Sequence, residues 1–327
     1  MWVTSSVQDI LQPTAIALGN FDGIHRGHQK VLQPILKLSD QVNKTVVSFK
    51  PHPREFFTGQ AHNLLTPVGE KAQFLKSLGF DQLVLLEFNQ ELANLTPQEF
   101  VKQIIVQQLK AIHISVGQDF HFGYQRRGNA EDLKRLAEDF QIKVDLVSLQ
   151  KIEYCHHSSN LKTIQKNTPH PYSTRISSSL IREALKSGKL EKANLMLGRP
   201  YSLQGEVIRG QQLGRKIGFP TANLKVPDNK FLPRFGVYAV RVSLNDKLAN
   251  SLLGVMNIGY RPTVSGNYPS VEVHLFDWEN KERLYNHSLH VRLEKFLRPE
   301  QKFASLEELK QQIKQDCLVA KSFFSQT

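Results

Sequence analysis

The string Gly-Asn-Phe-Asp-Gly-Ile-His-Arg-Gly-His, residues 19–28, predicts the architecture of the N-terminal half of the chain. It directly follows an apolar run at 14–18 and leads into an amphipathic helical pattern. Glycines let a backbone approach phosphate closely, and a helix N-terminus supplies N–H donors with partial positive charge. His25 and His28 are three residues apart, so one helical turn places both imidazoles on the same side. The string therefore indicates a phosphate-binding turn between a strand and a helix; a plain surface turn with two histidines is the alternative.

Residues 1–150 alternate short apolar runs with helical patterns. Thr96, Pro97 and Glu99 supply the N-cap, the first-turn proline and the capping box of one such helix. Strands that alternate with helices form parallel βαβ units, so we expect a Rossmann-like, doubly wound α/β domain. Its expected strands are residues 14–18, 45–49, 82–86, 112–116 and 143–147.

The second half of the chain has a different pattern. The polar stretch 151–175 predicts a long loop, and residues 176–200 predict a helical connector in which Gly188 ends a helix. After that, alternating runs predict a small antiparallel β-barrel, and a capping box at Ser305 predicts a terminal helix. The fold class is therefore α/β plus β, with domains at 1–186 and 187–327. The expected barrel runs are 203–209, 236–243, 251–258, 271–276 and 288–296.

The composition excludes several classes of protein. With 327 residues the chain exceeds the size at which one hydrophobic core usually stops growing, so two domains are expected. Apolar residues make up 40% and charged residues 22%, which excludes a disordered or collagen-like chain. No apolar run approaches the roughly 18–20 residues of a membrane span, and no secretory signal is present, so no membrane partner is expected. The two cysteines, Cys155 and Cys317, are too few for a disulfide framework and predict a cytoplasmic location.

The net charge of +12 raises the question of a nucleic-acid partner. The basic residues are spread along the chain without a basic tail, whereas nucleic-acid binders usually gather them on one face or arm. Diffuse positive charge also suits an enzyme whose substrates are phosphate anions, so we favour small-molecule substrates. An oligomer is compatible with the sequence, but no feature supports one.

These segments resemble a known family. His-x-Gly-His after a first strand is similar to the nucleotidyltransferase superfamily. The longer string at 19–28, with Phe-Lys-Pro-His-Pro at 49–53 and Val-Gly-Gln-Asp-Phe-His-Phe-Gly at 116–123, resembles the adenylyltransferase half of bacterial bifunctional riboflavin kinase/FAD synthetases. The segment Ile-Ser-Ser-Ser-Leu-Ile-Arg at 176–182 resembles the second phosphate motif of that superfamily. The resemblance implies that Arg182 grips the triphosphate, for which a guanidinium offers a planar fork of donors.

The resemblance also implies two sets of contacts, and each has a structural alternative. The serines of the second motif could only cap a helix, the polar loop residues could only form a turn, and the phenylalanines could only pack in a strand. The implied catalytic histidines are His25 and His28, which would stabilise the transferring phosphate. The implied nucleotide contacts are Gly19, Asn20, Phe21, Asp22, Gly23, Gly27, Ser177, Ser178 and Ser179. The implied flavin contacts are His52, Pro53, Asp119, Phe120, Phe122 and Arg261.

Residues 214–223, Gly-Arg-Lys-Ile-Gly-Phe-Pro-Thr-Ala-Asn, form the second informative string. Thr221 and Asn223 are two residues apart, so in an extended chain their side chains point the same way. A hydroxyl and an amide oxygen suit Mg²⁺ beside ATP phosphates. Together with Gly-Val-Tyr-Ala-Val from Gly236, Asn-Ile-Gly-Tyr-Arg-Pro-Thr from Asn257 and Val-Glu-Val-His-Leu-Phe-Asp from Val271, the string resembles the riboflavin kinase module. The resemblance implies a nucleotide loop at Gly214, Gly218, Thr221 and Asn223, with Mg²⁺ as cofactor and ATP, riboflavin and FMN as substrates.

Glu272 alternates with Val271 and Val273 in an expected strand. We expect its carboxylate on the inner face of the barrel, where it would be costly unless it has a task. The resemblance implies that it is the base that accepts the proton of the riboflavin hydroxyl. The alternative is a solvent-facing carboxylate paired with a nearby Lys or Arg.

Three departures from the family pattern concern the long loop, Lys50 in place of an acid, and Asn286 in place of a glycine. Within the loop, Cys155, His156, His157 and His170 could indicate a metal site, but their spacing favours a disordered insert. The sequence thus predicts an enzyme that phosphorylates riboflavin to FMN and adenylylates FMN to FAD. The alternative is a single adenylyltransferase with a flavin-binding or RNA-binding regulatory barrel.

Overall fold

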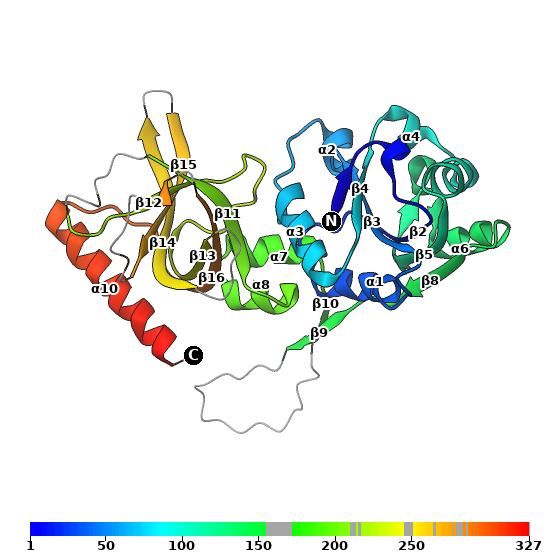
Figure 1. Ribbon diagram of the computed structural model, residues 1–327. Coiled ribbons are helices and arrows are strands. Elements are labelled where there is room, and N and C mark those ends of the chain that lie inside the picture. Colours follow the sequence, from blue (N-terminus) through cyan, green and yellow to red (C-terminus); the bar gives the residue numbers. More distant parts are fainter. Residues whose placement is uncertain are drawn as a thin grey trace, which may run out of the picture. The chain divides into compact units, whose positions relative to one another are not determined.

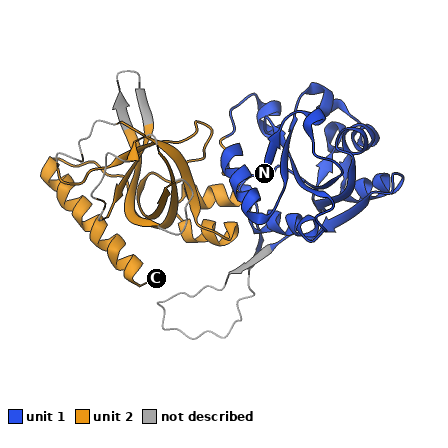
Figure 2. Cartoon of the chain, viewed as in Figure 1, with its two compact units in different colours: residues 1–62, 66–178 blue, residues 63–65, 179–327 orange. Residues whose placement is uncertain are grey.

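The computed structural model describes residues 1–154, 172–209, 214, 217–244, 251–263, 266–276, 278, 284–285 and 287–326. The chain divides into two compact units (Figure 2). The first consists of Met1–His62 and Thr66–Ser178, and the second of Asn63–Leu65 and Ser179–Thr327. The three residues Asn63–Leu65 therefore belong to the second unit, although their neighbours in sequence belong to the first.

A six-stranded parallel sheet forms the centre of the first unit (Figure 1). Its order is β1-β4-β3-β2-β5-β8, so the predicted doubly wound sheet and its five strands are confirmed. A short edge strand, β1, was not predicted. The strands are β1 Trp2–Thr4, β2 Thr14–Leu18, β3 Asn43–Lys50, β4 Gln82–Glu87, β5 Ala111–Gly117 and β8 Lys143–Val147.

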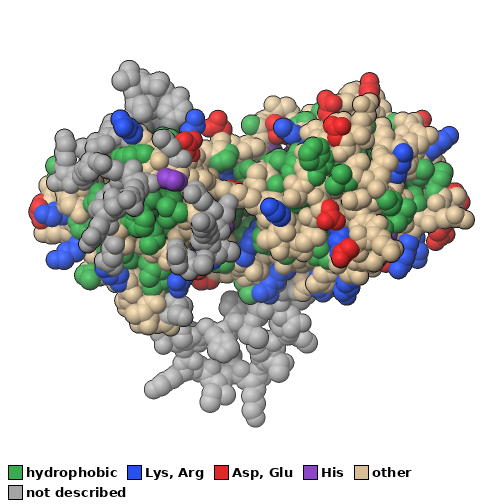
Figure 3. Space-filling model, viewed as in Figure 1, with side chains coloured by type: hydrophobic (Ala, Val, Ile, Leu, Met, Phe, Trp, Pro, Cys, Tyr) green, Lys and Arg blue, Asp and Glu red, His purple; other side chains and the backbone are tan. Residues whose placement is uncertain are grey.

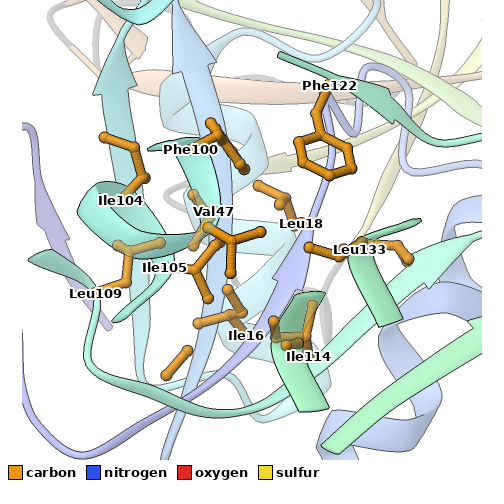
Figure 4. Packing of buried hydrophobic residues seen from close by; sticks show 14 of the residues in the cluster. Ile16, Leu18, Val47, Phe100, Ile104, Ile105, Leu109, Ile114, Phe122 and Leu133 are labelled. Atoms are coloured by element: carbon orange, nitrogen blue, oxygen red, sulfur yellow. The ribbon is translucent and has the colours of Figure 1, made fainter. Parts of the chain in front are cut away.

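Two hydrophobic clusters cover the two faces of this sheet, because alternate residues of β2 point to opposite sides. Ala15 and Ala17 pack with α1 on one face. Ile16 and Leu18 pack on the other face, in the cluster drawn in Figure 4. The capping box predicted at Thr96 is present, and the helix continues as a π-helix, η2. The helical elements are η1 Val7–Asp9, α1 Arg26–Leu36, α2 Pro53–Thr58, α3 Val68–Leu78, α4 Gln90–Asn94, α5 Pro97–Glu99, η2 Phe100–Gln108, η3 Tyr124–Arg126 and α6 Ala130–Glu138.

The strand order places a topological switch point beside β2. The chain moves from β2 outward through β3 to β4, and then returns to the other side of β2 as β5. Ligands of open α/β sheets bind outside the carboxyl ends of strands at such a point. The loop 19–25 follows β2 there, and the segment 118–123, which contains the two-residue strand β6 His121–Phe122 paired with β7 Gly128–Asn129, follows β5.

The predicted long loop at 151–175 is wrong at both ends. Strand β9, Lys151–Tyr154, pairs antiparallel with β10, Tyr172–Arg175. Both segments contain an aromatic and a β-branched residue, the residue types that favour strands. Residues 155–171 lie outside the described part of the chain, and with them the proposed metal ligands Cys155, His156, His157 and His170. Asn286 also lies outside the described residues.

The second unit contains a closed antiparallel barrel with strand order β11-β12-β15-β14-β13-β16 (Figure 1). The predicted barrel and terminal helix are confirmed, whereas the short strand β12 was not predicted. Helix α7 ends before Gly188, which has a φ of 76°. The elements are α7 Ser178–Lys186, α8 Leu190–Leu197, β11 Tyr201–Ile208, β12 Ala222–Lys225, β13 Gly236–Leu244, β14 Leu252–Thr263, β15 Gly266–Leu275, β16 Ser288–Pro299 and α10 Leu306–Ser325.

The segment Asn63–Leu65 is hydrogen-bonded into the second unit. Leu64 forms a parallel bridge with Lys230, and the N–H of Phe231 donates to the Leu64 carbonyl at 2.8 Å. The ammonium of Lys230 donates to the carbonyl of Leu65 at 2.9 Å, and both residues are buried. Within the described part of the chain, no helix is long and apolar enough to cross a membrane.

Candidate active sites

The loop between β2 and α1 has an unusual backbone. Phe21, Gly23 and Ile24 have φ angles of 47°, 88° and 38°, in the left-handed region. The side chains of Phe21 and Ile24 are buried in the core and so anchor these strained positions. Left-handed residues in a turn direct backbone N–H groups into a concavity that attracts anions. The geometry thus agrees with the phosphate-binding turn that the sequence predicts.

Side chains from three other segments hold the carbonyl groups of this loop. The carbonyl of Asn20 accepts hydrogen bonds from the hydroxyl of Ser48 at 3.0 Å and from the ammonium of Lys71 at 2.8 Å. The carbonyl of Asp22 accepts from the hydroxyl of Ser178 at 2.7 Å. Ser178 therefore contacts the first motif, whereas Lys71 was not singled out in the sequence.

His25 and His28 lie together at the start of α1. The two rings are stacked, with centroids 3.6 Å apart and planes inclined by 14°, as the spacing predicts. His25 is the N-cap, and its Nδ1 accepts from the backbone N–H of His28 at 3.2 Å. A neutral His25 therefore carries its proton on Nε2, which is a hydrogen-bond donor. A Cβ atom on Gly27 would lie 3.1 Å from this ring, so the absence of a side chain at Gly27 accommodates His25.

His52 and Pro53 lie at the start of α2, after the carboxyl end of β3. His52 is the N-cap, with Nδ1 accepting from the N–H of Arg54 at 3.1 Å, and its ring centroid is 4.4 Å from that of His62. An aromatic cluster follows in which the ring centroids of Phe56, Phe57 and Phe88 are 5.3 to 5.6 Å apart. Phe57 is 70% exposed, an unusual position for an aromatic ring. This cluster was not predicted from the sequence, although two phenylalanines beside a proline motif could have indicated it.

The segment after β5 separates the residues that the sequence analysis grouped as flavin contacts. The carboxylate of Asp119 accepts a hydrogen bond from Arg175 of β10. Phe122 is buried against Phe100, with ring centroids 5.3 Å apart, and belongs to the core. Phe120 is half-buried and stacks on Phe122 at 5.7 Å. Asp119 and Phe120 therefore have more exposed surface than Phe122.

The second motif is divided between the two units. Ser177 and Ser178 belong to the first unit, and Ser179 and Arg182 to the second. Within the second unit, the guanidinium of Arg182 donates to the carbonyl of Asn63 at 3.1 Å and lies 5.7 Å from the ring centroid of Phe231.

Three predicted kinase residues come together on the barrel. The hydroxyl of Thr221 donates to a carboxylate oxygen of Glu272 at 3.3 Å. Asn223 on β12 and Asn257 on β14 lie directly opposite Glu272 on β15, one from each side. Residues directly opposite in antiparallel strands share a face, so the two amides flank the carboxylate. Asn257 was not singled out as a site residue. The hydroxyl, amide and carboxylate oxygens are hard donors and fit Mg²⁺.

The expectation that Glu272 lies on the inner face of the barrel is wrong. Val271 and Val273, its neighbours, are 3% and 1% exposed and point inward. Glu272 and His274 lie on the same face of β15, and His274 is paired with Val255 of β14. Val255 packs against α10 outside the barrel, so this shared face is the outer one. Apolar side chains fill the interior, so strand alternation places the carboxylate on the outer face. There a ligand can reach it from outside the barrel.

The glycines of the second string have clear steric roles. A Cβ atom on Gly214 would lie 2.3 Å from the carbonyl oxygen of Phe219, whose N–H donates to the Gly214 carbonyl at 2.8 Å. Gly218 has a φ of 87°, which favours glycine. Arg261 lies on β14 opposite Tyr268. Residues 210–213, 215 and 216 lie outside the described part of the chain.

A parallel sheet with a left-handed turn and two stacked histidines at its switch point, followed by an antiparallel barrel with an oxygen-rich site, is the arrangement of a two-module enzyme of phosphate transfer. Comparison with known proteins gives the same two modules. Residues 7–161 match the family model described as FAD synthetase, and residues 197–324 match the model described as riboflavin kinase.

Curated relatives cover nearly the whole chain. The bifunctional riboflavin kinase/FMN adenylyltransferase of Escherichia coli (strain K12) is 39% identical over 95% of this chain and 93% of its own length. The protein of the same name from Bacillus subtilis (strain 168) is 35% identical over the same shares. A solved structure from Streptococcus pneumoniae, named as a macrolide-efflux protein, is 29% identical with a TM-score of 0.77, over 96% of both chains.

The chain belongs to the family of bifunctional riboflavin kinase/FMN adenylyltransferases. It is a transferase with both a riboflavin kinase and an FAD synthetase, so the predicted double activity is confirmed over the single-activity alternative. ATP, riboflavin and FMN are the small-molecule substrates that these activities require.

Proposed function

We propose that the first unit adenylylates FMN at the turn 19–28, in a domain comprising residues 1–186. An oxygen of the FMN phosphate attacks the α-phosphorus of ATP, the bond to the β-phosphate breaks, and pyrophosphate leaves. The nucleophile is already an anion, so the task of the protein is to stabilise charge on the transferring and leaving groups. His25 donates a hydrogen bond through Nε2 to the phosphate oxygens, and the ring of His28 is stacked beside it, with the two ring centroids 3.6 Å apart.

The remaining contacts of the first reaction are assigned by the same proposal. The turn residues Gly19, Asn20, Phe21, Asp22, Gly23 and Gly27 approach the nucleotide, together with Ser177, Ser178 and Ser179, and Arg182 grips the triphosphate. The hydrogen bond from Ser178 to the Asp22 carbonyl supports a common site for Ser178 and the turn. The flavin lies near His52, Pro53, Asp119 and Phe120, where the exposed ring of Phe57 offers a stacking surface. The buried ring of Phe122 stacks on Phe120 and holds it in place. Arg261 contributes to the flavin site of the second reaction.

The second domain, residues 187–327, phosphorylates riboflavin to FMN. The riboflavin hydroxyl oxygen attacks the γ-phosphorus of ATP, the bond from that phosphorus to the β-phosphate oxygen breaks, and ADP leaves. Glu272 accepts the proton of the attacking hydroxyl. Thr221 and Asn223 hold Mg²⁺, which neutralises phosphate charge when bound, beside a nucleotide loop at Gly214 and Gly218. The Thr221–Glu272 hydrogen bond, with Asn223 directly opposite, supports this assignment.

We also propose that the enzyme works in the cytoplasm on small molecules. On the face drawn in Figure 3, basic and acidic side chains are interspersed over the described residues, an arrangement that does not favour nucleic acid.

The single observation that carries the proposal is the pair of separate sites, the stacked histidines on the sheet and the Thr221–Glu272 pair on the barrel. Purified protein is incubated with riboflavin, ATP and Mg²⁺, and products are separated by chromatography. FMN should form first and FAD after it, and addition of EDTA should stop phosphorylation. FMN without FAD, also when FMN is supplied, would contradict the assignment of the first unit.

A further inference from the structure

Lys71 of α3 is a buried ammonium that the reaction described above does not use. Its side chain is 4% exposed. The ammonium donates to the Asn20 carbonyl at 2.8 Å and to the Ser48 hydroxyl at 3.1 Å, and this hydroxyl donates to the same carbonyl at 3.0 Å. Lysine, serine and carbonyl therefore form a closed hydrogen-bonded triangle beneath the phosphate-binding turn.

Burial of this charge is unfavourable for the fold. It lowers the pKa of Lys71 to about 8, although the carboxylate of Asp22 acts in the opposite direction. Asp22 reaches the site from the turn after β2, and from β3 the ammonium meets the uncharged hydroxyl of Ser48. An apolar side chain of similar volume would avoid the cost of removing the charge from water. A benefit to the turn would explain why a lysine occupies this position.

The geometry of the peptide unit indicates that benefit. A peptide group is planar and trans, so its carbonyl and the N–H of the next residue point in opposite directions. Two donors draw the Asn20 carbonyl towards β3 and α3. The N–H of Phe21 is then directed to the other side of the turn. Phe21 itself is left-handed, a conformation that needs such support from its surroundings.

We propose that Lys71 is a positioning residue for adenylyl transfer, which holds the peptide between Asn20 and Phe21 in the orientation that binds the polyphosphate of ATP. The inference rests on the proposed function of the turn 19–28. Lys71 acts through the Asn20 carbonyl and does not touch the reacting atoms. A protonated amine makes a stronger, charge-assisted hydrogen bond than a neutral one, so the turn should loosen as Lys71 loses its proton.

The test compares four forms of the full chain: wild type, Lys71→Met, Ser48→Ala and Lys76→Met. Lys76 is exposed on the same helix and is the matched control for loss of a charge. FAD formation from FMN and ATP is measured from pH 6 to 10, with kcat and the KM for ATP separated. FMN formation from riboflavin by the same samples reports on the other unit, and thermal unfolding reports on folding.

For Lys71→Met we expect kcat/KM for ATP in adenylylation to fall by about 10- to 100-fold at pH 7, the range for loss of a hydrogen bond to a charged group. The KM for ATP should rise, and FMN formation should stay as in Lys76→Met. Wild-type adenylylation should fall above about pH 8 towards the Lys71→Met level, whereas the variant should lack this decline. Ser48→Ala keeps the ammonium of Lys71 but removes one of its hydrogen-bond acceptors, which should lower the pKa of Lys71 further. The decline of adenylylation in this variant should therefore begin at a lower pH than in wild type.

Two results would overturn the inference. The first is Lys71→Met with the adenylylation rate and pH profile of Lys76→Met. The second, which applies even if Lys71→Met does not fold, is a Ser48→Ala profile that coincides with wild type. A wild-type chain that makes no FAD would instead overturn the proposed function of the turn, and the inference with it.

Discussion

Replacement of Gly27 by alanine tests whether the position of the His25 ring controls adenylylation. The new Cβ atom would lie 3.1 Å from two atoms of that ring, where ordinary contacts begin near 3.4 Å, so the ring must move by a few tenths of an ångström. A misplacement of 1 Å can cost about 100-fold in rate, so a shift of this size should lower FAD formation by about 3- to 10-fold. The capping hydrogen bond of His25, already 3.2 Å long, should weaken as well.

The same change should have little effect on stability. Loss of an N-cap lowers the free energy of unfolding by about 0.5–2 kcal/mol, whereas alanine in place of glycine within a helix raises it by up to about 1 kcal/mol. The free energy of unfolding should therefore change by about 1 kcal/mol or less. Gly69→Ala is the matched control, because Gly69 is likewise the second residue of a helix and a Cβ atom there would meet nothing within 4 Å.

The assay is FAD formed from FMN and ATP by both variants, with FMN formed from riboflavin on the same samples as the internal control. Control of adenylylation by the position of the His25 ring is excluded if Gly27→Ala makes FAD at the rate of Gly69→Ala. It would also be refuted if riboflavin phosphorylation fell in parallel while thermal unfolding stayed unchanged.

Four further predictions follow from the structure. His28→Ala should stop FAD formation while FMN accumulates from riboflavin, and parallel loss of both products in a folded protein would contradict the two-site assignment. Glu272→Gln should lower riboflavin phosphorylation by about 10²–10⁴-fold, the usual cost of losing a general base, and should leave FAD formation from added FMN unchanged. A variant that phosphorylates riboflavin at nearly the wild-type rate would exclude Glu272 as the base. Phe57→Ala should raise the KM for FMN in adenylylation by about 2- to 10-fold, the value of a stacked aromatic contact, and an unchanged KM would exclude that contact. Burial lowers the pKa of Lys71 from 10.5 to about 8, so between these pH values the unfolded chain binds the proton more tightly than the folded chain. The free energy of unfolding of the wild type, followed by thermal unfolding, should therefore rise with pH in this range. The same rise in Lys71→Met would show that Lys71 is not its cause.

The sequence allowed most of the fold to be predicted, because periodicity reports directly on buried faces. The five apolar runs of the first half all became strands, and the alternating runs of the second half became the barrel. Among the strands that were missed, β1 and β12 have three and four residues and β6 and β7 have two each, so all four are too short to show a period. Residues 151–154 and 172–175 were read as loop, because their pairing joins segments separated by the polar stretch between them.

The candidate sites were predictable only where the contacts are local. The stacking of His25 and His28 follows from their spacing on one helical turn. Alternation in β15 shows that Glu272 and its neighbours face opposite sides of the sheet. It does not show which of these sides is the interior of the barrel, so the inner face was wrongly assigned to Glu272. Lys71 lies 51 residues from Asn20 and 23 from Ser48, and a lysine in a helical pattern normally indicates solvent.

The hydrogen bonds of Asn63–Leu65 have a consequence for the genetic dissection of this enzyme. The second unit is discontinuous in sequence, so a single break in the gene cannot yield both units complete. A fragment that begins at residue 179, where the second unit resumes, still lacks the backbone that bridges Lys230 and accepts the hydrogen bonds of Phe231 and of the Lys230 ammonium. It would expose a buried lysine that has lost its carbonyl acceptor. A kinase fragment designed to be faithful to this structure would therefore need those three residues grafted back, for instance through a circularly permuted chain.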